Sequence, residues 1–191
     1  VFLSHRHGDH ILGVPTLVQM AKHRHRRLRI VGLQDVIFAT RQLLEATGTS
    51  DYDKYVDFVK VFTNSELRLG DYALRFAEVS HPVPCLAIRV ESEGKCIVYS
   101  GDTSFSETLV DLARGCDLLI HEVSGYSAEA HTHGHSTVYD AVRTAVEARV
   151  KKLAIVHFYI DSPTLKPEAL KPLAEARIEL VVPYPCYSID L

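Results

Sequence analysis

The chain has 191 residues, of which 47% are hydrophobic and 24% charged, and its net charge is −3. This length can bury one sizeable core but is short for two, so we expect a single domain over residues 1–191. The small negative charge excludes a broad cationic surface for nucleic acid or acidic lipid. Any polyanion would therefore have to meet a local basic patch.

The four cysteines stand singly in apolar segments, which is typical of reduced core thiols and not of a disulfide framework: Cys85, Cys96, Cys116 and Cys186. No apolar run approaches the roughly 18 residues of a membrane span, and no signal-peptide pattern is present. We therefore expect a cytoplasmic protein without membrane contact. The chain opens on apolar Val1-Phe2-Leu3 without an initiator Met, so we also expect that N-terminal strands of the fold are missing from it.

The first half of the chain predicts two helices and a series of strands. Apolar residues at near-helical spacing predict a helix over 11–22, and a strand over 28–33 and an amphipathic helix over 36–46 follow. Short β-rich runs predict further strands at 57–62, 72–79, 85–90 and 95–99, with a tight turn at Glu93-Gly94 between the last two.

Beyond residue 100, helices and strands alternate. Helices are expected at 105–114, 137–149 and 167–175, and strands at 117–121, 152–158 and 178–182. Strands first and alternation later predict an α/β fold in which sheet layers are covered by helices.

A basic run, Lys22 to Arg29, follows the first predicted helix. Such a run either contacts nucleic-acid phosphates or forms a solvated face, and the sequence leaves both interpretations open.

Histidines are concentrated at the start of the chain, in Ser4-His5-Arg6-His7-Gly8-Asp9-His10. In an extended loop, residues two apart point the same way, so His5 and His7 can reach one cation with imidazole nitrogens. Asp9 and His10 can turn toward a second cation. A solvated polar loop is the alternative interpretation of this segment.

The order His-x-His-x-Asp-His resembles the metal motif of the metallo-β-lactamase superfamily. The resemblance implies an αββα four-layer sandwich and three further ligands at strand ends, for which His81, Asp102 and His157 stand in the right order. It gives the first metal His5, His7 and His81, gives the second Asp9, His10 and His157, and makes Asp102 the bridge. Read singly, His81 could be structural and Asp102 a turn residue, whereas His157 interrupts an apolar strand, where burial without a partner would be costly. Nitrogen and oxygen ligands suit two zinc ions, with Mn²⁺ or Fe²⁺ as alternatives.

Two later segments resemble ribonuclease Z: Leu118 to Ser124, which contains His121-Glu122, and Gly134-His135-Ser136-Thr137. The resemblance implies that Glu122 orients His135, which donates a proton to the leaving oxygen. Alternatively, Glu122 holds a ligand histidine, and the His135 loop faces solvent while Ser136 or Thr137 caps the next helix. The chain departs from many bacterial members, which carry a long tRNA-gripping insertion where this sequence has only the turn around Ser92 to Lys95.

These features together predict a metal-dependent phosphodiesterase that acts on RNA or a small phosphodiester. The nucleophile would be a hydroxide that bridges the metals, oriented by Asp9, with His135 as general acid. The same fold also serves hydrolases of carboxylic, thioester, lactone or sulfate esters. A non-catalytic metal-binding scaffold and a di-iron electron-transfer protein are further alternatives, and a homodimer is compatible with the sequence.

Overall fold

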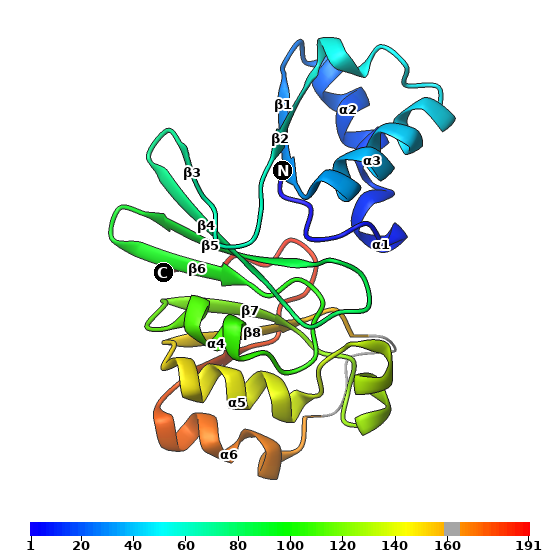
Figure 1. Cartoon of the computed structure of the whole chain (residues 1–191). Helices are drawn as coiled ribbons and strands as arrows, with labels where there is room; N and C mark the ends of the chain where they lie inside the picture. Colours follow the sequence, from blue (N-terminus) through cyan, green and yellow to red (C-terminus); the bar gives the residue numbers. More distant parts are fainter. Residues whose placement is uncertain (159–164) are drawn as a thin grey trace. The chain divides into compact units, whose positions relative to one another are not determined.

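The computed structural model describes residues 1–158 and 165–191, and the chain forms two compact units, Val1–Phe62 and Thr63–Leu191 (Figure 1). We call them unit 1 and unit 2. The expected single domain over 1–191 stays a prediction. Within the described ranges, no helix combines the length and apolar character needed to cross a bilayer.

Unit 1 is built on two parallel strands joined by a helix. β1 (Leu28–Gly32) pairs with β2 (Val56–Lys60), and α3 (Gln34–Ala46) connects them, because parallel neighbours need a crossover. Two helices precede them, α1 (Gly8–Ile11) and α2 (Val14–His23), and a short 3-10 turn, η1 (Tyr52–Lys54), precedes β2.

The apolar faces of α2 and α3 pack with the strands into the core of unit 1. Its fully buried members are Leu3, Ile11, Val14, Val18, Ile30, Val36, Leu44, Tyr52 and Val56. The expected helix over 11–22 begins three residues late, since Pro15 occupies its first turn, where a missing N–H costs nothing.

Unit 2 contains one mixed sheet of seven strands in sequential order. The first four strands are antiparallel neighbours, and the remaining pairs are parallel. The strands are β3 (Glu66–Leu69), β4 (Tyr72–Glu78), β5 (Leu86–Ser92), β6 (Lys95–Tyr99), β7 (Leu118–Glu122), β8 (Lys152–Val156) and β9 (Glu179–Val181).

Three helices cover one face of this sheet (Figure 1). They are α4 (Glu107–Ala113), α5 (Val138–Ala148) and α6 (Pro167–Ala176), and a 3-10 segment, η2 (Ala128–His133), precedes α5. The main core lies between helices and strands, with small residues such as Ala141, Ala145 and Ala148 of α5 wholly buried against the sheet. A smaller cluster of Leu118, Ala154 and Val181 lies on strands β7 to β9.

The expected α/β fold with helix-covered sheets is confirmed in each unit, whereas the four-layer arrangement stays a prediction. The expected tight turn is also confirmed: Glu93 and Gly94 join β5 to β6 with φ of 52° and 73°, values that suit a two-residue hairpin. The sequence did not predict β3, a four-residue edge strand too short to show a clear alternation.

The expectation of four reduced core thiols is wrong for three of the cysteines. Cys96 and Cys116 form a disulfide, Cys186 is exposed, and only Cys85 is a buried free thiol. The physical reason is the parallel pairing of β6 with β7, which brings the starts of both strands together. The amide of Asp117 donates to the carbonyl of Cys96 at 3.0 Å, an adjacency hidden by a separation of 20 residues.

Asp117 reinforces the same junction with its side chain. The buried carboxylate accepts the Cys96 amide at 2.8 Å through Oδ2 and the Lys151 ammonium at 2.7 Å through Oδ1. Hydrogen bonds from Lys151 and from the Cys96 amide hold the pKa of Asp117 below its ordinary value of 3.8. Its contribution to stability is therefore complete above the ordinary pKa and is lost as pH falls through the lowered one.

We predict that Asp117→Asn lowers the free energy of unfolding by about 1 kcal/mol at neutral pH, because a charge-assisted hydrogen bond is lost while Lys151 stays largely exposed. Urea denaturation at a series of pH values should show the difference between wild type and variant shrinking below the ordinary aspartate pKa. A difference that stays constant into strongly acidic solution would contradict the assigned linkage.

Candidate metal centre

The histidine segment of unit 1 follows a short extended stretch that pairs with β1. Phe2 forms a parallel bridge with Val31, and the amide of Leu3 donates to the Val31 carbonyl at 2.9 Å. Gly32 permits this approach, since a Cβ there would lie 3.1 Å from the Leu3 carbonyl oxygen. The position of His5 is therefore fixed by backbone pairing two residues upstream.

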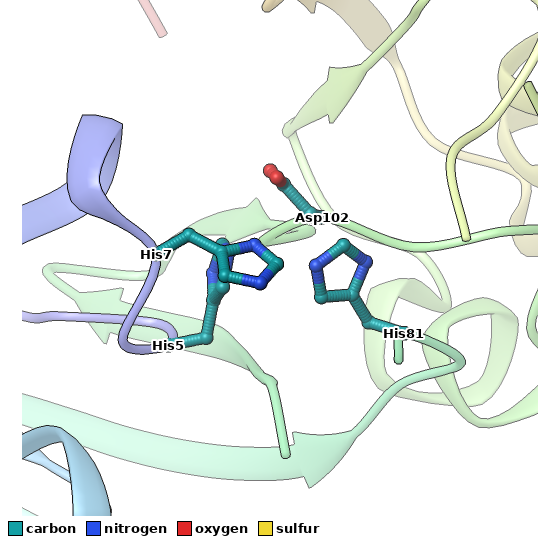
Figure 2. Close-up of side chains that lie close together, drawn as sticks. All are labelled: His5, His7, His81 and Asp102. Atoms are coloured by element: carbon teal, nitrogen blue, oxygen red, sulfur yellow. The ribbon is translucent and has the colours of Figure 1, made fainter. Parts of the chain in front are cut away.

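In unit 1, the imidazoles of the segment lie against one another. The rings of His5 and His7 meet edge to face with centroids 4.6 Å apart (Figure 2), and those of His5 and His10 are 4.1 Å apart. His7 has extended backbone as the N-cap of α1. The turn of α1 then places Asp9 Oδ2 3.4 Å from His10 Nε2, with the Asp9 side chain 62% exposed.

Ser4 lies between two of these rings. Its Oγ is 3.1 Å from Nδ1 of the wholly buried His5 and 3.3 Å from Nδ1 of His10. A hydroxyl has two lone pairs, so it can accept a hydrogen bond from both rings. In that arrangement each ring keeps its Nε2 lone pair, which is the donor that a divalent cation needs.

In unit 2, the candidate residues gather at one edge of the sheet. β4 and β6 each run antiparallel to β5 and therefore run in the same direction, and β6, β7 and β8 are parallel. The carboxyl ends of these four strands consequently lie along one edge, where ligand sites in such sheets are usually found. His81 follows β4, Asp102 follows β6, Glu122 ends β7 and His157 follows β8.

Asp102 lies at the centre of this group and is 1% exposed. Its Oδ2 is 3.6 Å from His157 Nε2 and 3.9 Å from His135 Nδ1. The His135 ring in turn lies 5.3 Å from that of His81 and 5.6 Å from that of His157. The ligand atoms of Asp102 and His81, and those of Asp102 and His157, come within 4.8 Å of one another.

His157 adopts a backbone conformation that is unfavourable for a histidine. Its φ is 64°, in the left-handed region that residues other than glycine seldom occupy. Such a conformation costs free energy and is retained where the surrounding structure enforces it, often at functional sites. The strain turns the chain immediately after β8 and aims the imidazole at Asp102.

His81 is oriented by the loop that carries His135. Its Nδ1 is 3.0 Å from the carbonyl oxygen of Gly134, and a carbonyl can only accept, so Nδ1 bears the proton. In this tautomer Nε2 carries a lone pair of the kind that a divalent cation binds. Gly134 has a φ of 74°, and a Cβ at this position would lie 2.3 Å from Cδ of Pro82. Figure 2 shows His81 and Asp102 on their two loops.

Glu122 connects two loops of unit 2 through one oxygen. Its wholly buried Oε1 accepts the amide of Thr103 at 3.0 Å, the amide of Ser136 at 3.1 Å and Nδ1–H of His135 at 3.0 Å. Ser136 adds a bond from its Oγ to the Thr103 carbonyl at 2.6 Å. The carboxylate therefore fixes the loop of Asp102 and the loop of His135 relative to each other, and the pairing of Glu122 with His135 has the geometry that the resemblance implies.

Sequence reasoning missed the supporting roles of Thr103, Ser136 and His121. Backbone amides carry no sequence signal, which hides the contacts of Thr103 and Ser136 with Glu122. The helix cap is Thr137, which forms a capping box with Asp140.

His121 is wholly buried, and its Nδ1 donates to the Glu122 carbonyl at 2.7 Å. Burial lowers the pKa of His121, with a smaller opposing effect from that hydrogen bond, so this histidine is neutral at physiological pH.

Part of the basic run serves the fold of unit 1. Arg27 holds Asp57 at 2.5 Å and the Lys54 carbonyl at 2.6 Å, and Lys22 holds Asp51 at 2.7 Å. The side chains of residues 23–26 are exposed. The run is thus partly structural, and both interpretations of its exposed part remain predictions.

Comparison with known proteins decides the family. Residues 1–158 match the family described as the beta-lactamase superfamily domain. The chain belongs to the metallo-β-lactamase superfamily. It has the fold of that superfamily, carries His/Asp clusters consistent with a metal site, and lacks the long insertion, since a two-residue turn joins β5 to β6.

The chain is similar to three known proteins of this fold. It is 33% identical to a ribonuclease Z of Ignicoccus hospitalis over 83% of this chain and 69% of that protein. The probable metallo-hydrolase YhfI of Bacillus subtilis is 28% identical over 82% of this chain, which spans 64% of that relative's length. The crystal structure of YhfI gives a TM-score of 0.74 at 25% identity, covering 94% of this chain and 72% of the other. The short form of human tRNase Z gives a TM-score of 0.69 at 22% identity, covering 94% and 74%, which shows the fold alone.

We predict that Gly134→Ala destabilises unit 2 more than Gly115→Ala does. Both glycines have positive φ, 74° and 70°, which costs an alanine about 1–2 kcal/mol. Only Gly134 has close neighbours, and the clash with Pro82 should add about 1–3 kcal/mol. Chemical denaturation measures the difference, and zinc affinity should fall only for Gly134→Ala because His81 is displaced. Equal effects of the two substitutions would refute the idea that Gly134 is needed for the close approach of its loop to Pro82 and His81.

Proposed function

We propose that this chain is a metal-dependent phosphodiesterase with a centre for two divalent cations. The proposed ligands are His5, His7 and His81 for the first cation and Asp9, His10 and His157 for the second, with Asp102 shared. The residues fit such cations, because the donors are imidazole nitrogens and carboxylate oxygens, and within unit 2 the ligand atoms of the buried Asp102 come within 4.8 Å of those of His81 and His157. Nitrogen and oxygen donors favour Zn²⁺, with Mn²⁺ and Fe²⁺ as the alternatives.

The observation that carries the proposed reaction is the pairing of Glu122 with His135 beside Asp102. Oε1 of Glu122 holds Nδ1–H of His135 at 3.0 Å, which fixes the orientation and the tautomer of the ring. The opposite nitrogen, Nε2, can then give a proton to a departing oxygen. The His135 side chain is 17% exposed, so the ring is held firmly while one face stays accessible.

We assign each step of the proposed hydrolysis to particular residues. Two divalent cations, when bound, supply an activated water and neutralise charge on the phosphoryl group. Asp9 is the exposed carboxylate of the set, and we assign it the orientation of the attacking water. His135 protonates the leaving alkoxide, and Glu122 stabilises the imidazolium before the transfer.

The proposed substrate is RNA or a smaller phosphodiester. Support comes from the similarity to ribonuclease Z of Ignicoccus hospitalis. The exposed Arg24 and Arg26 are available for phosphate contacts on a chain that carries a net charge of −3. A panel of phosphodiesters, phosphomonoesters, carboxylic esters and sulfate esters, assayed with Zn²⁺ or Mn²⁺, separates this proposal from the other ester hydrolases of the fold.

We predict that the wild-type chain binds about two divalent cations and that Asp102→Ala loses most of both, because the variant removes the shared ligand. Plasma emission spectrometry measures the metal content. Asp71→Ala, an exposed aspartate in the turn between β3 and β4, is the matched control and should keep both cations. Full metal content in Asp102→Ala would refute the proposed bridge.

We predict that His135→Ala loses activity on the order of 10²–10⁴-fold with an alkyl or nucleotide diester. The loss should be much smaller with bis(p-nitrophenyl) phosphate, since p-nitrophenolate departs without a proton. Glu122→Gln should show the same asymmetry in weaker form, because it keeps an oxygen for the amides of Thr103 and Ser136. Metal content should stay near wild type in both variants.

His131→Ala is the matched control for the His135 variant. His131 lies on the same loop, and its side chain is 46% exposed and bonded to Asp140 at 2.7 Å, so both substrates should be hydrolysed nearly as by wild type. If His135→Ala slows both substrates equally with its metals retained, the residue binds substrate or stabilises the transition state without donating a proton.

A further inference from the structure

A second grouping of metal-binding atoms lies entirely within unit 2. Glu122, His135 and His157 each present one ligand atom, and these atoms come within 4.8 Å of one another. Two imidazoles and a carboxylate form a common ligand set for a divalent cation in proteins. This set overlaps the proposed two-metal centre only at His157, and it includes the residue proposed as general acid.

The carboxylate of Glu122 provides an independent indication of a cation. Oε1 already accepts three hydrogen bonds, whereas the buried Oε2 has no hydrogen-bond partner among residues 1–158 and 165–191. A buried carboxylate oxygen without a partner is costly, and native structures seldom leave one unexplained. A cation bound by this carboxylate would offset that cost.

The rings on either side are placed to complete the site. His135 and His157 stack with an interplanar angle of 22° and centroids 5.6 Å apart. Nδ1 of His135 is 3.0 Å from Glu122 Oε1, which is close to the separation of two ligands on one zinc ion, where each bond is about 2.0–2.2 Å long. Small movements of the side chains would bring all three donors onto a single ion.

We propose that Glu122, His135 and His157 form an alternative position for one divalent cation, held by unit 2 without any ligand from unit 1. The cation takes the Nδ1 lone pair of His135, and the proton that Nδ1 shared with Glu122 passes to water. Because a neutral imidazole offers one lone pair, His157 cannot ligate this cation and the second cation of the proposed centre simultaneously. The two positions therefore exclude each other.

The functional consequence rests on the proposed function. A cation on Nδ1 prevents His135 from forming an imidazolium, and the N–H that remains on Nε2 of a metal-bound neutral imidazole is a much weaker acid. Such a chain is therefore metal-loaded but inactive toward diesters with poor leaving groups. The position stores a cation when Asp9 and His10 are not engaged. Transfer of the cation to Asp9, His10 and His157 then restores the proton to His135.

The test uses Co²⁺ as a visible probe in a background that removes the unit 1 ligands of the second cation, Asp9→Ala with His10→Ala. We expect this double variant to bind about two Co²⁺ per chain, one of them in the alternative position. Adding His135→Ala should reduce the content to about one, whereas adding His131→Ala should leave it unchanged. His135→Cys in the same background should give thiolate-to-cobalt charge-transfer absorption, which requires direct ligation at position 135.

Two results would overturn the proposal. The first is a content of one Co²⁺ per chain in the double variant, with either histidine or alanine at position 135. The second is a content of two Co²⁺ per chain that persists when His135→Ala is added. If circular dichroism shows that the double variant fails to fold, the exposed Asp9→Asn replaces it with the same readouts and the same criteria. Metal counts need no substrate. If the wild-type chain hydrolyses none of the phosphodiesters while the double variant binds Co²⁺ that depends on His135, only the proposed function is refuted. If the wild-type chain hydrolyses phosphodiesters while no bound Co²⁺ depends on His135, only the alternative position is refuted.

Discussion

The buried carboxylate of Glu122 holds the candidate site in unit 2 together, because a single oxygen accepts hydrogen bonds from two loops at once. The amide of Thr103 fixes the loop of Asp102, and the amide of Ser136 with Nδ1–H of His135 fixes the loop before α5. Hydrogen bonds to a charged acceptor are stronger than neutral ones, and a donor left unsatisfied at this depth would cost the full desolvation penalty. Replacing Glu122 by an apolar residue would therefore release both loops and their side chains together.

Sheet topology explains why so many polar residues can lie together at low cost. Strands β4, β6, β7 and β8 end at one edge, so each contributes one polar residue at the end of its backbone ladder or just beyond it. Below that edge the sheet is apolar, with Leu119 and Leu153 wholly buried. The free energy gained in this core supports the local cost of the left-handed His157 and the neutral, buried His121.

The sequence predicted the α/β alternation, the hairpin at Glu93-Gly94 and the order of the candidate ligands, because these depend on local periodicity and on a motif. The sequence did not predict the backbone contacts, because the amides of Thr103 and Ser136 have no side-chain signature. Nor did it predict the φ of His157, which the neighbouring residues do not determine. The sequence did not predict the Cys96–Cys116 disulfide for a related reason: parallel strand pairing brings together residues that a helix separates in sequence. Patterning along a chain indicates which elements form, whereas long-range pairing decides which side chains meet.

In the proposed scheme, a proton and a metal ion compete for the same nitrogen of His135, and the number of available ligands decides between them. The alternative position offers two imidazoles and one carboxylate, from Glu122, His135 and His157. The proposed second-cation position offers two imidazoles and two carboxylates, from Asp9, His10, His157 and the shared Asp102. The additional negative ligand favours the latter for a dipositive ion, because each carboxylate contributes Coulombic attraction to the cation. In this scheme His135 keeps its Nδ1 proton whenever Asp9 and His10 bind the second cation, so the proposed ligands that complete the metal centre also leave His135 available as the proposed general acid.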